Sequence, residues 1–187
     1  MIVGTHEQVA RLQQTLFANA EQTFFKLQES MKTIDAMQFF SAVKFPPLGP
    51  DPVAGTPLNL IEQINQTQSN LVVLAAAHDL IEQYPGKLFQ LQLGASAGFD
   101  VASTDGQVVA ECFAVASVSS NDKMNKDCKK LMNSGVEHKH IYFYSYLDSE
   151  KKLQNRYKKY PYIRFARVYA LAQSTNVSLE GTVYEKN

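Results

Sequence analysis

The sequence predicts a single-domain α/β protein in which helices flank a mixed central sheet. The chain has 187 residues, 45% of them hydrophobic, so it can bury a core of its own without crosslinks. From residue 57 onward the apolar pattern changes between helical and alternating periods, in the order helix, strand, strand, strand, helix, strand. Asp105-Gly106, a strong tight-turn signal, joins two of those strands.

Residues 1–56 are predicted to form a helical extension and a connection. Thr5 and Gln8 fit a capping box, and apolar residues follow at helical spacing, which predicts a helix from about 6 to about 32. Residues 45–57 contain five of the seven prolines, a density that neither a helix nor a central strand tolerates. This segment is therefore expected to connect the first helix to the core.

Residues 57–147 are predicted to form the core. Thr56 and Pro57 fit an N-cap and a first helical residue, and Pro85-Gly86 is expected to end this second helix at Tyr84. The later elements are strands over 87–94, 99–104 and 107–115, a helix over 123–135 and a strand over 140–147. The spacing in the later helix points four side chains inward, namely Met124, Cys128, Leu131 and Met132.

Residues 148–187 are predicted to be a basic strand region, with a strand around 163–171. Residues 1–120 carry 5 Lys and Arg against 11 Asp and Glu, and residues 121–187 carry 13 against 7, so the two parts have net charges of −6 and +6. This asymmetry indicates a polyanion-facing half, although folding that interleaves the charges is an equal alternative.

Cations and tyrosines alternate in this C-terminal region, a mixture that suits phosphate contacts and base stacking. An ordinary solvated edge strand, in which lysines discourage aggregation, explains the same pattern. If the first interpretation holds, the nucleic-acid-binding residues are Asn121, Arg156, Lys158, Lys159 and Arg164.

Two acidic residues occupy strand positions that ordinarily carry apolar side chains. Asp100 opens the second predicted strand and Glu111 lies within the third, on either side of the tight turn. Paired strands can project both carboxylates from one face, where two like charges without a cation would raise one pKa. A magnesium site for phosphodiester chemistry uses only one or two protein carboxylates. The spacing therefore predicts a Mg²⁺ site, in which Mn²⁺ is an acceptable substitute.

This order of elements, with Gly98-Phe99-Asp100 and then Ala110-Glu111-Cys112-Phe113, resembles the restriction-endonuclease-like fold of the PD-(D/E)XK nuclease superfamily. The resemblance covers residues 57 to about 147 and implies an αβββαβ core with a mixed sheet. It implies a Mg²⁺-dependent endonuclease of the restriction or defence type that cuts double-stranded DNA. Asp100 and Glu111 are then the expected metal ligands and catalytic residues, with Glu62 of the first core helix as a further ligand.

The chain departs from the family motif at the lysine that follows the second acid by two positions, because Phe113 stands there. Some members carry this lysine on the helix after the third strand. Lys123, near the start of that helix, is the expected catalytic replacement, and Lys126 is the second choice. If no lysine reaches the site, the resemblance implies a catalytically inactive DNA-binding or protein-interaction subunit.

Each functional residue also has a structural interpretation. Asp100 and Glu111 fit the solvent-facing side of an amphipathic hairpin, and Lys123 and Asp127 fit a surface ion pair at helical spacing. Cys112 fits a buried inert thiol better than a nucleophile, and the close cysteine pairs typical of zinc sites are absent. A structural helper without nucleic acid is a third function class.

The remaining expectations concern location and assembly. The chain has two cysteines, no basic segment followed by an apolar one at its start, and no apolar run near the ~20 residues of a membrane span. These features predict a cytoplasmic protein without a membrane partner. The long first helix, rich in Gln, Phe and Leu, packs on the core or forms the face of a homodimer.

Overall fold

The structure is a computed structural model, and it describes residues 1–94 and 97–169. The helices are α1 (His6–Met31), α2 (Ala36–Lys44), α3 (Leu60–Gln83), α4 (Lys123–Met132), α5 (Glu150–Tyr157) and the short 3₁₀ turn η1 (Ser120–Asp122). The strands are β1 (Ile2–Val3), β2 (Gly49–Pro50), β3 (Pro57–Leu58), β4 (Phe89–Leu91), β5 (Val101–Ser103), β6 (Val108–Val115), β7 (His138–Ser145) and β8 (Arg164–Arg167).

The central sheet is mixed, and its strand order is β1-β4-β5-β6-β7-β8. The pairs from β1 to β6 are antiparallel, whereas β6-β7 and β7-β8 are parallel and are joined through α4 and α5. From α3 to β7 the elements follow the order helix, three strands, helix, strand. The α/β class with a mixed, helix-flanked sheet is therefore confirmed.

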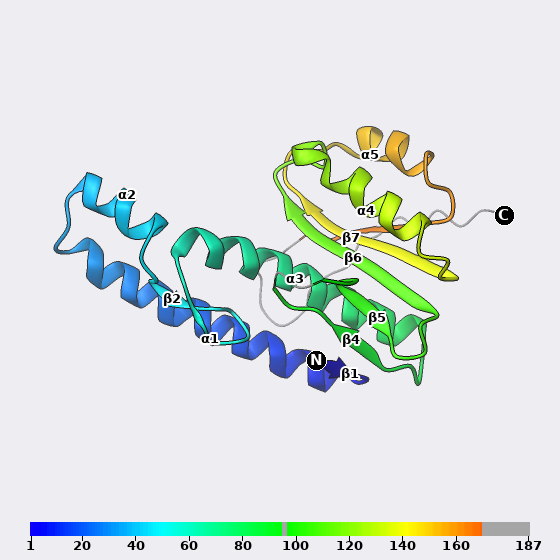
Figure 1. Cartoon of the computed structure of the whole chain (residues 1–187), viewed down its shortest axis with the longest axis horizontal. Helices are drawn as coiled ribbons and strands as arrows, with labels where there is room; N and C mark the ends of the chain where they lie inside the picture. The colour runs from blue at the N-terminus through cyan, green and yellow to red at the C-terminus, as the bar shows by residue number, and fades with distance from the viewer. Residues whose placement is uncertain (95–96, 170–187) are drawn as a thin grey trace.

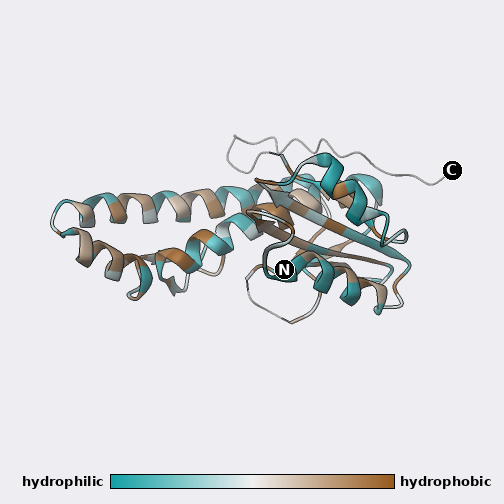
Figure 2. Ribbon diagram, turned by 90° about the horizontal axis from the view of Figure 1, so that it is seen from above, coloured by the Kyte–Doolittle hydropathy of each residue, from teal (hydrophilic) through white to brown (hydrophobic). Residues whose placement is uncertain are grey.

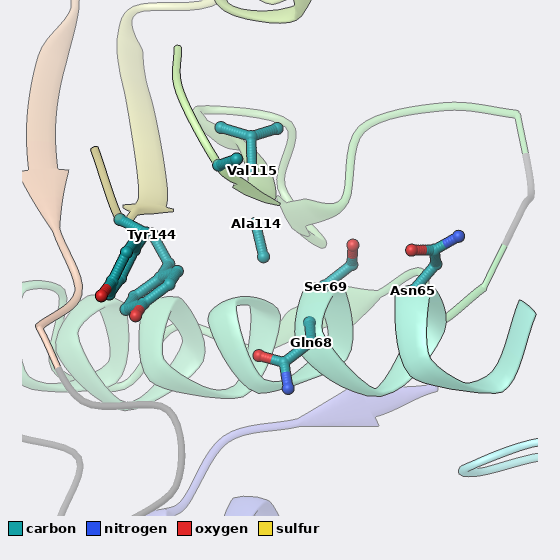
Figure 3. Close-up of a pocket in the computed structure, with 8 residues that line it drawn as sticks. Asn65, Gln68, Ser69, Ala114, Val115 and Tyr144 are labelled. Carbon is teal, nitrogen blue, oxygen red and sulfur yellow. The ribbon is translucent and has the colours of Figure 1, made fainter. Parts of the chain in front are cut away.

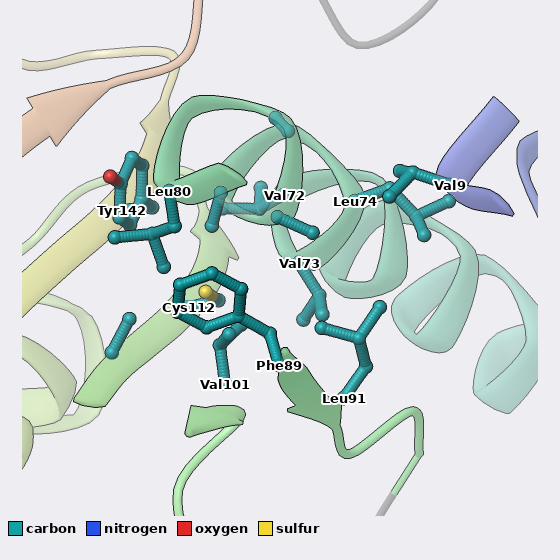
Figure 4. Close-up of a cluster of buried hydrophobic side chains, with 14 of the residues drawn as sticks. Val9, Val72, Val73, Leu74, Leu80, Phe89, Leu91, Val101, Cys112 and Tyr142 are labelled. Atoms are coloured by element: carbon teal, nitrogen blue, oxygen red, sulfur yellow. The ribbon is translucent and has the colours of Figure 1, made fainter. Parts of the chain in front are cut away.

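Helices cover both faces of the sheet, and each face has its own core (Figure 1). On one face α1 and α3 pack against Phe89, Val101 and Tyr142, as Figure 4 shows for α3. On the other face α4 and α5 pack against Phe113 and Phe143. Alternation along β6 separates the two cores, because even-numbered residues from Val108 to Cys112 face α3 and odd-numbered ones face α4.

The end of α1 and the whole of α2 extend away from the sheet as a helical arm, defined here as residues 20–45 (Figures 1 and 2). Polar contacts join the root of this arm to α3, since the Gln63 side chain donates to Thr23 Oγ1 (2.6 Å) and to the Pro50 carbonyl (2.8 Å). Gly49 lies against Thr23 so closely that an added Cβ would be 1.8 Å from Thr23 Oγ1.

Most predicted elements form where the sequence indicates, with three exceptions. The second core helix begins at Leu60 and not at Pro57, because the Asn59 side chain caps it by accepting from the Glu62 amide (2.9 Å) while Pro57 pairs in β3. Met132 was expected to face inward but is exposed, one residue after the buried Leu131.

The third exception is the C-terminal region, where residues 150–157 form α5, so that the basic segment is part helix and part strand. β8 accounts for the strand expected around 163–171, of which residues 170 and 171 lie outside the described residues. Across the part of the chain that is described, no helix combines the length and apolar character needed to cross a bilayer.

A carboxylate and lysine cluster at the β5–β6 fork

Glu111 lies in the middle of β6 and points toward α4, on the same face as Phe113. Its side chain is only 2% exposed, although it is acidic. The Lys130 ammonium on α4 pairs with Glu111 Oε1 and also donates to the carbonyl of Gly98. The solvent-facing alternative for Glu111 is therefore wrong, and α4 supplies the charge that compensates it.

Asp100 lies where β5 and β6 separate, a place we call the fork. The register pairs Val101 with Ala110, which brings Asp100 opposite Glu111. β5 contributes no further ladder bond here, and the Asp100 side chain replaces it by accepting from the Cys112 amide (2.7 Å). Asp100 is thus half-buried beside Glu111 and belongs to the same cluster of charges.

Asp127 of α4 adds a third carboxylate to the fork. It is buried and accepts from the Lys123 ammonium (2.8 Å), so the expected ion pair forms between a buried carboxylate and a partly exposed lysine. The same ammonium lies 5.8 Å from the centre of the Phe113 ring, above the position that the family motif gives to lysine. The Lys123 ammonium therefore lies near the position where the family motif has a lysine and this chain has Phe113.

The proton affinities at the fork reflect burial and mutual repulsion. Burial, opposed by Lys130 and reinforced by the charge of Asp100, raises the pKa of Glu111 to about 7. Burial likewise raises the pKa of Asp127. Burial alone would lower the pKa of Lys123, but the surrounding carboxylates have the larger effect, so its pKa is raised. The cluster thus holds more negative charge than its lysines fully offset.

The carboxylate oxygens at the fork decide whether the site can hold Mg²⁺. Asp127 Oδ2 is buried and has no hydrogen-bond partner among residues 1–94 and 97–169. Within the same residues, no three His, Cys, Asp or Glu side chains are grouped as a metal cage. Mg²⁺ ordinarily takes one or two protein carboxylates and leaves its other positions to water and phosphate. The carboxylates of Asp100 and Glu111 fit such a site, provided that Glu111 exchanges its ion pair with Lys130 for the metal ion.

Three other predicted residues are not brought into the cluster by any contact. Lys126 is exposed on α4, and Asn121 is exposed with a left-handed backbone (φ 51°) in the turn before it. Glu62 is exposed in the first turn of α3, one helical turn before Asn65, which lines a cavity together with Asp100.

The predicted nucleic-acid-binding cations lie on both sides of the sheet. Arg156 of α5 donates to Ser119 Oγ (2.9 Å), and Lys158 and Lys159 follow it as exposed residues on the α4 side. Arg164 of β8 instead donates to Gln83 at the end of α3, on the opposite face. These cations therefore do not form one continuous patch.

Lys130 was not predicted, and Asp127 was predicted only as the partner in a surface ion pair, but a signal for both exists. Lys123, Asp127 and Lys130 are spaced by four and three residues, so they share one stripe of a helix. That stripe faces Glu111, which makes Lys130 the partner of the acid that the sequence did single out.

Cys112 and two histidines have structural explanations. Burial and nearby carboxylates raise the pKa of the Cys112 thiol well above its ordinary value, which disfavours a thiolate nucleophile. His140 Nε2 shares a hydrogen bond with the Tyr84 hydroxyl (3.0 Å), and burial lowers the pKa of His140 to about 3. His78 also has a partner, since its Nδ1 lies 2.8 Å from His6 Nδ1.

Comparison of the chain with family models, with curated proteins and with solved structures finds no match.

Proposed function

We propose that the protein is a Mg²⁺-dependent endonuclease with a restriction-endonuclease-like core, of the restriction or defence type, that acts on DNA. One observation carries the proposal. Asp100 and Glu111 lie opposite each other at the fork of β5 and β6, and Lys123 extends from α4 over Phe113 beside them. This combination of two acids and a nearby cation supports the proposal, with the lysine on a helix instead of a strand.

The roles follow from the chemistry of each group. Mg²⁺, or Mn²⁺ with the same preference for oxygen ligands, would lower the pKa of a bound water and neutralise charge on the scissile phosphate. Asp100 and Glu111 would hold the ion. Lys123 would orient the attacking water or the phosphate, because its charge is retained among carboxylates. Lys130 holds Glu111 in place before the ion binds.

Cleavage of supercoiled plasmid tests the proposal directly. We expect nicking in Mg²⁺ or Mn²⁺ and none in EDTA, with a loss of at least a hundredfold in Asp100→Asn and Glu111→Gln. Lys123→Met should lose comparable activity, and Lys126→Met should retain it. Glu21→Gln, a carboxylate-to-amide change on the exposed arm, is the matched control. Cutting that survives the Asp100 change would exclude this site as the catalyst.

Metal binding has a readout that does not depend on activity. Ligands that bind only the native state raise its stability in proportion to the logarithm of their concentration. Mg²⁺ should therefore raise the Tm of the wild-type chain and leave the Tm of Asp100→Asn unchanged. An equal rise in both proteins would place the ion elsewhere.

A specific observation favours a second candidate, an inactive subunit with the same fold that binds DNA or protein. Glu111 is 2% exposed and already paired with Lys130, which is the arrangement of a structural ion pair. If plasmid cutting is absent under all metal conditions, duplex binding that weakens steeply with salt supports the DNA-binding form, because phosphate contacts release counterions.

We also propose that two copies of the chain associate through the arm. Six large apolar side chains there are 55–74% exposed, namely Phe24, Phe25, Met31, Met37, Phe40 and Phe45. Because an aromatic side chain offers about 150–250 Å² in total, these six expose several hundred Å², approaching the ~800 Å² per partner of a stable interface. Residues 20–45 carry three lysines and three acidic residues, so two arms approach without net repulsion.

Light scattering after gel filtration tests this assembly. The wild-type chain should have twice the mass of one chain at micromolar concentration, and Phe24→Glu with Phe40→Glu should be monomeric. Gln22→Glu with Gln28→Glu adds the same charge at exposed polar positions of the arm and should remain dimeric. A monomeric wild-type chain would contradict the proposal.

A further inference from the structure

A groove runs along α3 where β6 and β7 end, and it consists of two adjoining cavities that share lining residues. One of ≈ 340 Å³ lies between α3 and the residues around Ala114 and Tyr144, and one of ≈ 220 Å³ leads on to Asp100. Asn65 and Ser69 line both cavities, and Figure 3 shows them on α3 across from the end of β6. The larger cavity falls in the range of roughly 300–1,000 Å³ that is typical of small-molecule sites.

Five of the residues that line this α3 groove carry side-chain amides. They belong to Asn65, Gln66, Gln68, Asn70 and Gln92. Asn70 is only 2% exposed, yet its Nδ2 has no hydrogen-bond partner in the described part of the chain, and the same is true of the buried Gln66 Oε1. An unsatisfied buried donor and acceptor are costly, so a cavity that contains both is suited to a ligand that pairs with each.

The charge and the aromatic groups of the groove narrow the ligand class. Among the described residues, Asp100 is the one charged residue that lines either cavity, and no lysine or arginine does, so the groove disfavours a phosphate group. Tyr144 and Tyr146 contribute rings at its far end. Neutral donors and acceptors beside aromatic rings match the edges and the faces of a nucleobase.

We propose that the α3 groove holds an unpaired nucleobase, with its edge on the amides of α3 and its face against Tyr144 or Tyr146. The inference rests on the proposed function, because the groove leads to Asp100 and the base would belong to the strand that is cut. A base in this groove requires an unpaired segment, so the substrate class becomes DNA with a single-stranded region. The groove thus selects the substrate, and the fork cleaves it.

Fluorescence anisotropy of the full chain in EDTA tests the groove without cleavage. The probe is a fluorescein-labelled single-stranded DNA of ten nucleotides, compared with the same strand made of abasic residues. We expect the abasic strand to bind at least tenfold more weakly, since base stacking and edge contacts are lost. Tyr146→Ala and Gln68→Ala should each lower affinity for the normal strand three- to thirtyfold and leave the abasic strand unaffected.

Matched changes elsewhere identify the binding surface. Gln14→Ala removes an exposed amide from α1 and should leave affinity unchanged. Tyr162 is 74% exposed, against 76% for Tyr146, and lies in the basic C-terminal segment. If Tyr162→Ala removes the preference for bases and Tyr146→Ala does not, the bases stack on that segment and the proposal is overturned.

Three further results would also overturn it. They are equal affinity for the normal and abasic strands, no binding at 100 µM protein, and competition by the neutral sugar maltotriose, which would assign the amides to carbohydrate. The outcomes remain distinct from those of plasmid cleavage. Cutting without base-dependent binding rejects the groove alone, and base-dependent binding without metal-dependent cutting rejects the nuclease alone.

Discussion

The arm and the sheet use their apolar residues in opposite ways. In the sheet and its covering helices, aromatic side chains such as Phe89, Phe113 and Tyr142 are buried in the two cores. In the arm, Val43 is the one large apolar side chain of the described residues 20–45 that is buried, and Phe24 and Phe40 are exposed. Hydrophobic burial therefore stabilises the sheet within one chain, whereas the arm is held at its root by polar contacts and has apolar area left for a partner.

The largest expected effect is the difference in stability loss when one aromatic ring is removed from each region. Phe143→Ala removes a fully buried side chain and should lower the free energy of unfolding by about 3–5 kcal/mol. Phe40→Ala removes a ring that is 63% exposed and should change it by less than about 0.5 kcal/mol. Urea unfolding of both variants, at concentrations where the chain is monomeric, measures the difference. Equal losses would mean that the arm has a core of its own.

The next effect concerns the buried acid of the sheet. Because the pKa of Glu111 is raised from 4.5 to about 7, the folded state binds the proton more tightly, and its stability falls as pH rises from about 4.5 to about 7. Glu111→Gln should therefore be more stable than wild type at pH 8, by up to about 3 kcal/mol, and equally stable near pH 4. Lys130 tolerates the change because its side chain is 42% exposed.

Urea unfolding in EDTA at the two pH values checks this prediction. Glu137→Gln, which alters an exposed acid just before β7, is the control and should show no pH-dependent gain. A variant that is less stable than wild type at pH 8 would mean that the ion pair with Lys130 outweighs the cost of burying the carboxylate.

A smaller effect concerns the junction between the two regions. Gly49→Ala places a methyl group 1.8 Å from Thr23 Oγ1 and should destabilise the chain by about 1–3 kcal/mol. Thr23→Ala removes the obstructing hydroxyl, so the double variant should recover part of the loss. The recovery, measured as a coupling energy by thermal unfolding, reports how closely the arm is fixed. Strict additivity would show that the arm root relaxes freely.

The elements that could be predicted are those with a strong local signal. The hairpin of β5 and β6 follows from Asp105-Gly106, and α1 follows from its capping box, which the structure contains. α5 has a single buried apolar residue, Leu153, so hydrophobic periodicity does not reveal it. α2 was not predicted although Asp35 and Gln38 form a capping box, because the helix is short and buries only Val43.

The acids of the candidate site could be predicted, but their partners could not. Asp100 and Glu111 stand out as charges in apolar strands, whereas Lys130 becomes visible only once α4 is known to cross the fork. Asn70 gave no signal at all, since an amide on a long helix is ordinary until its cavity is seen. Burial of polar atoms is a property of three-dimensional packing and is absent from local sequence patterns.

The division of the sheet into antiparallel and parallel halves has a consequence for folding kinetics. β4, β5 and β6 are neighbours in sequence and pair through short loops, whereas β7 and β8 add to β6 only after helical crossovers close much longer loops. Distant pairings form slowly, so we expect the meander to assemble first and the parallel strands to dock last. During that interval the side of β6 that carries Val109 and Phe113 is uncovered, which makes the nascent chain most prone to aggregate before α4 arrives.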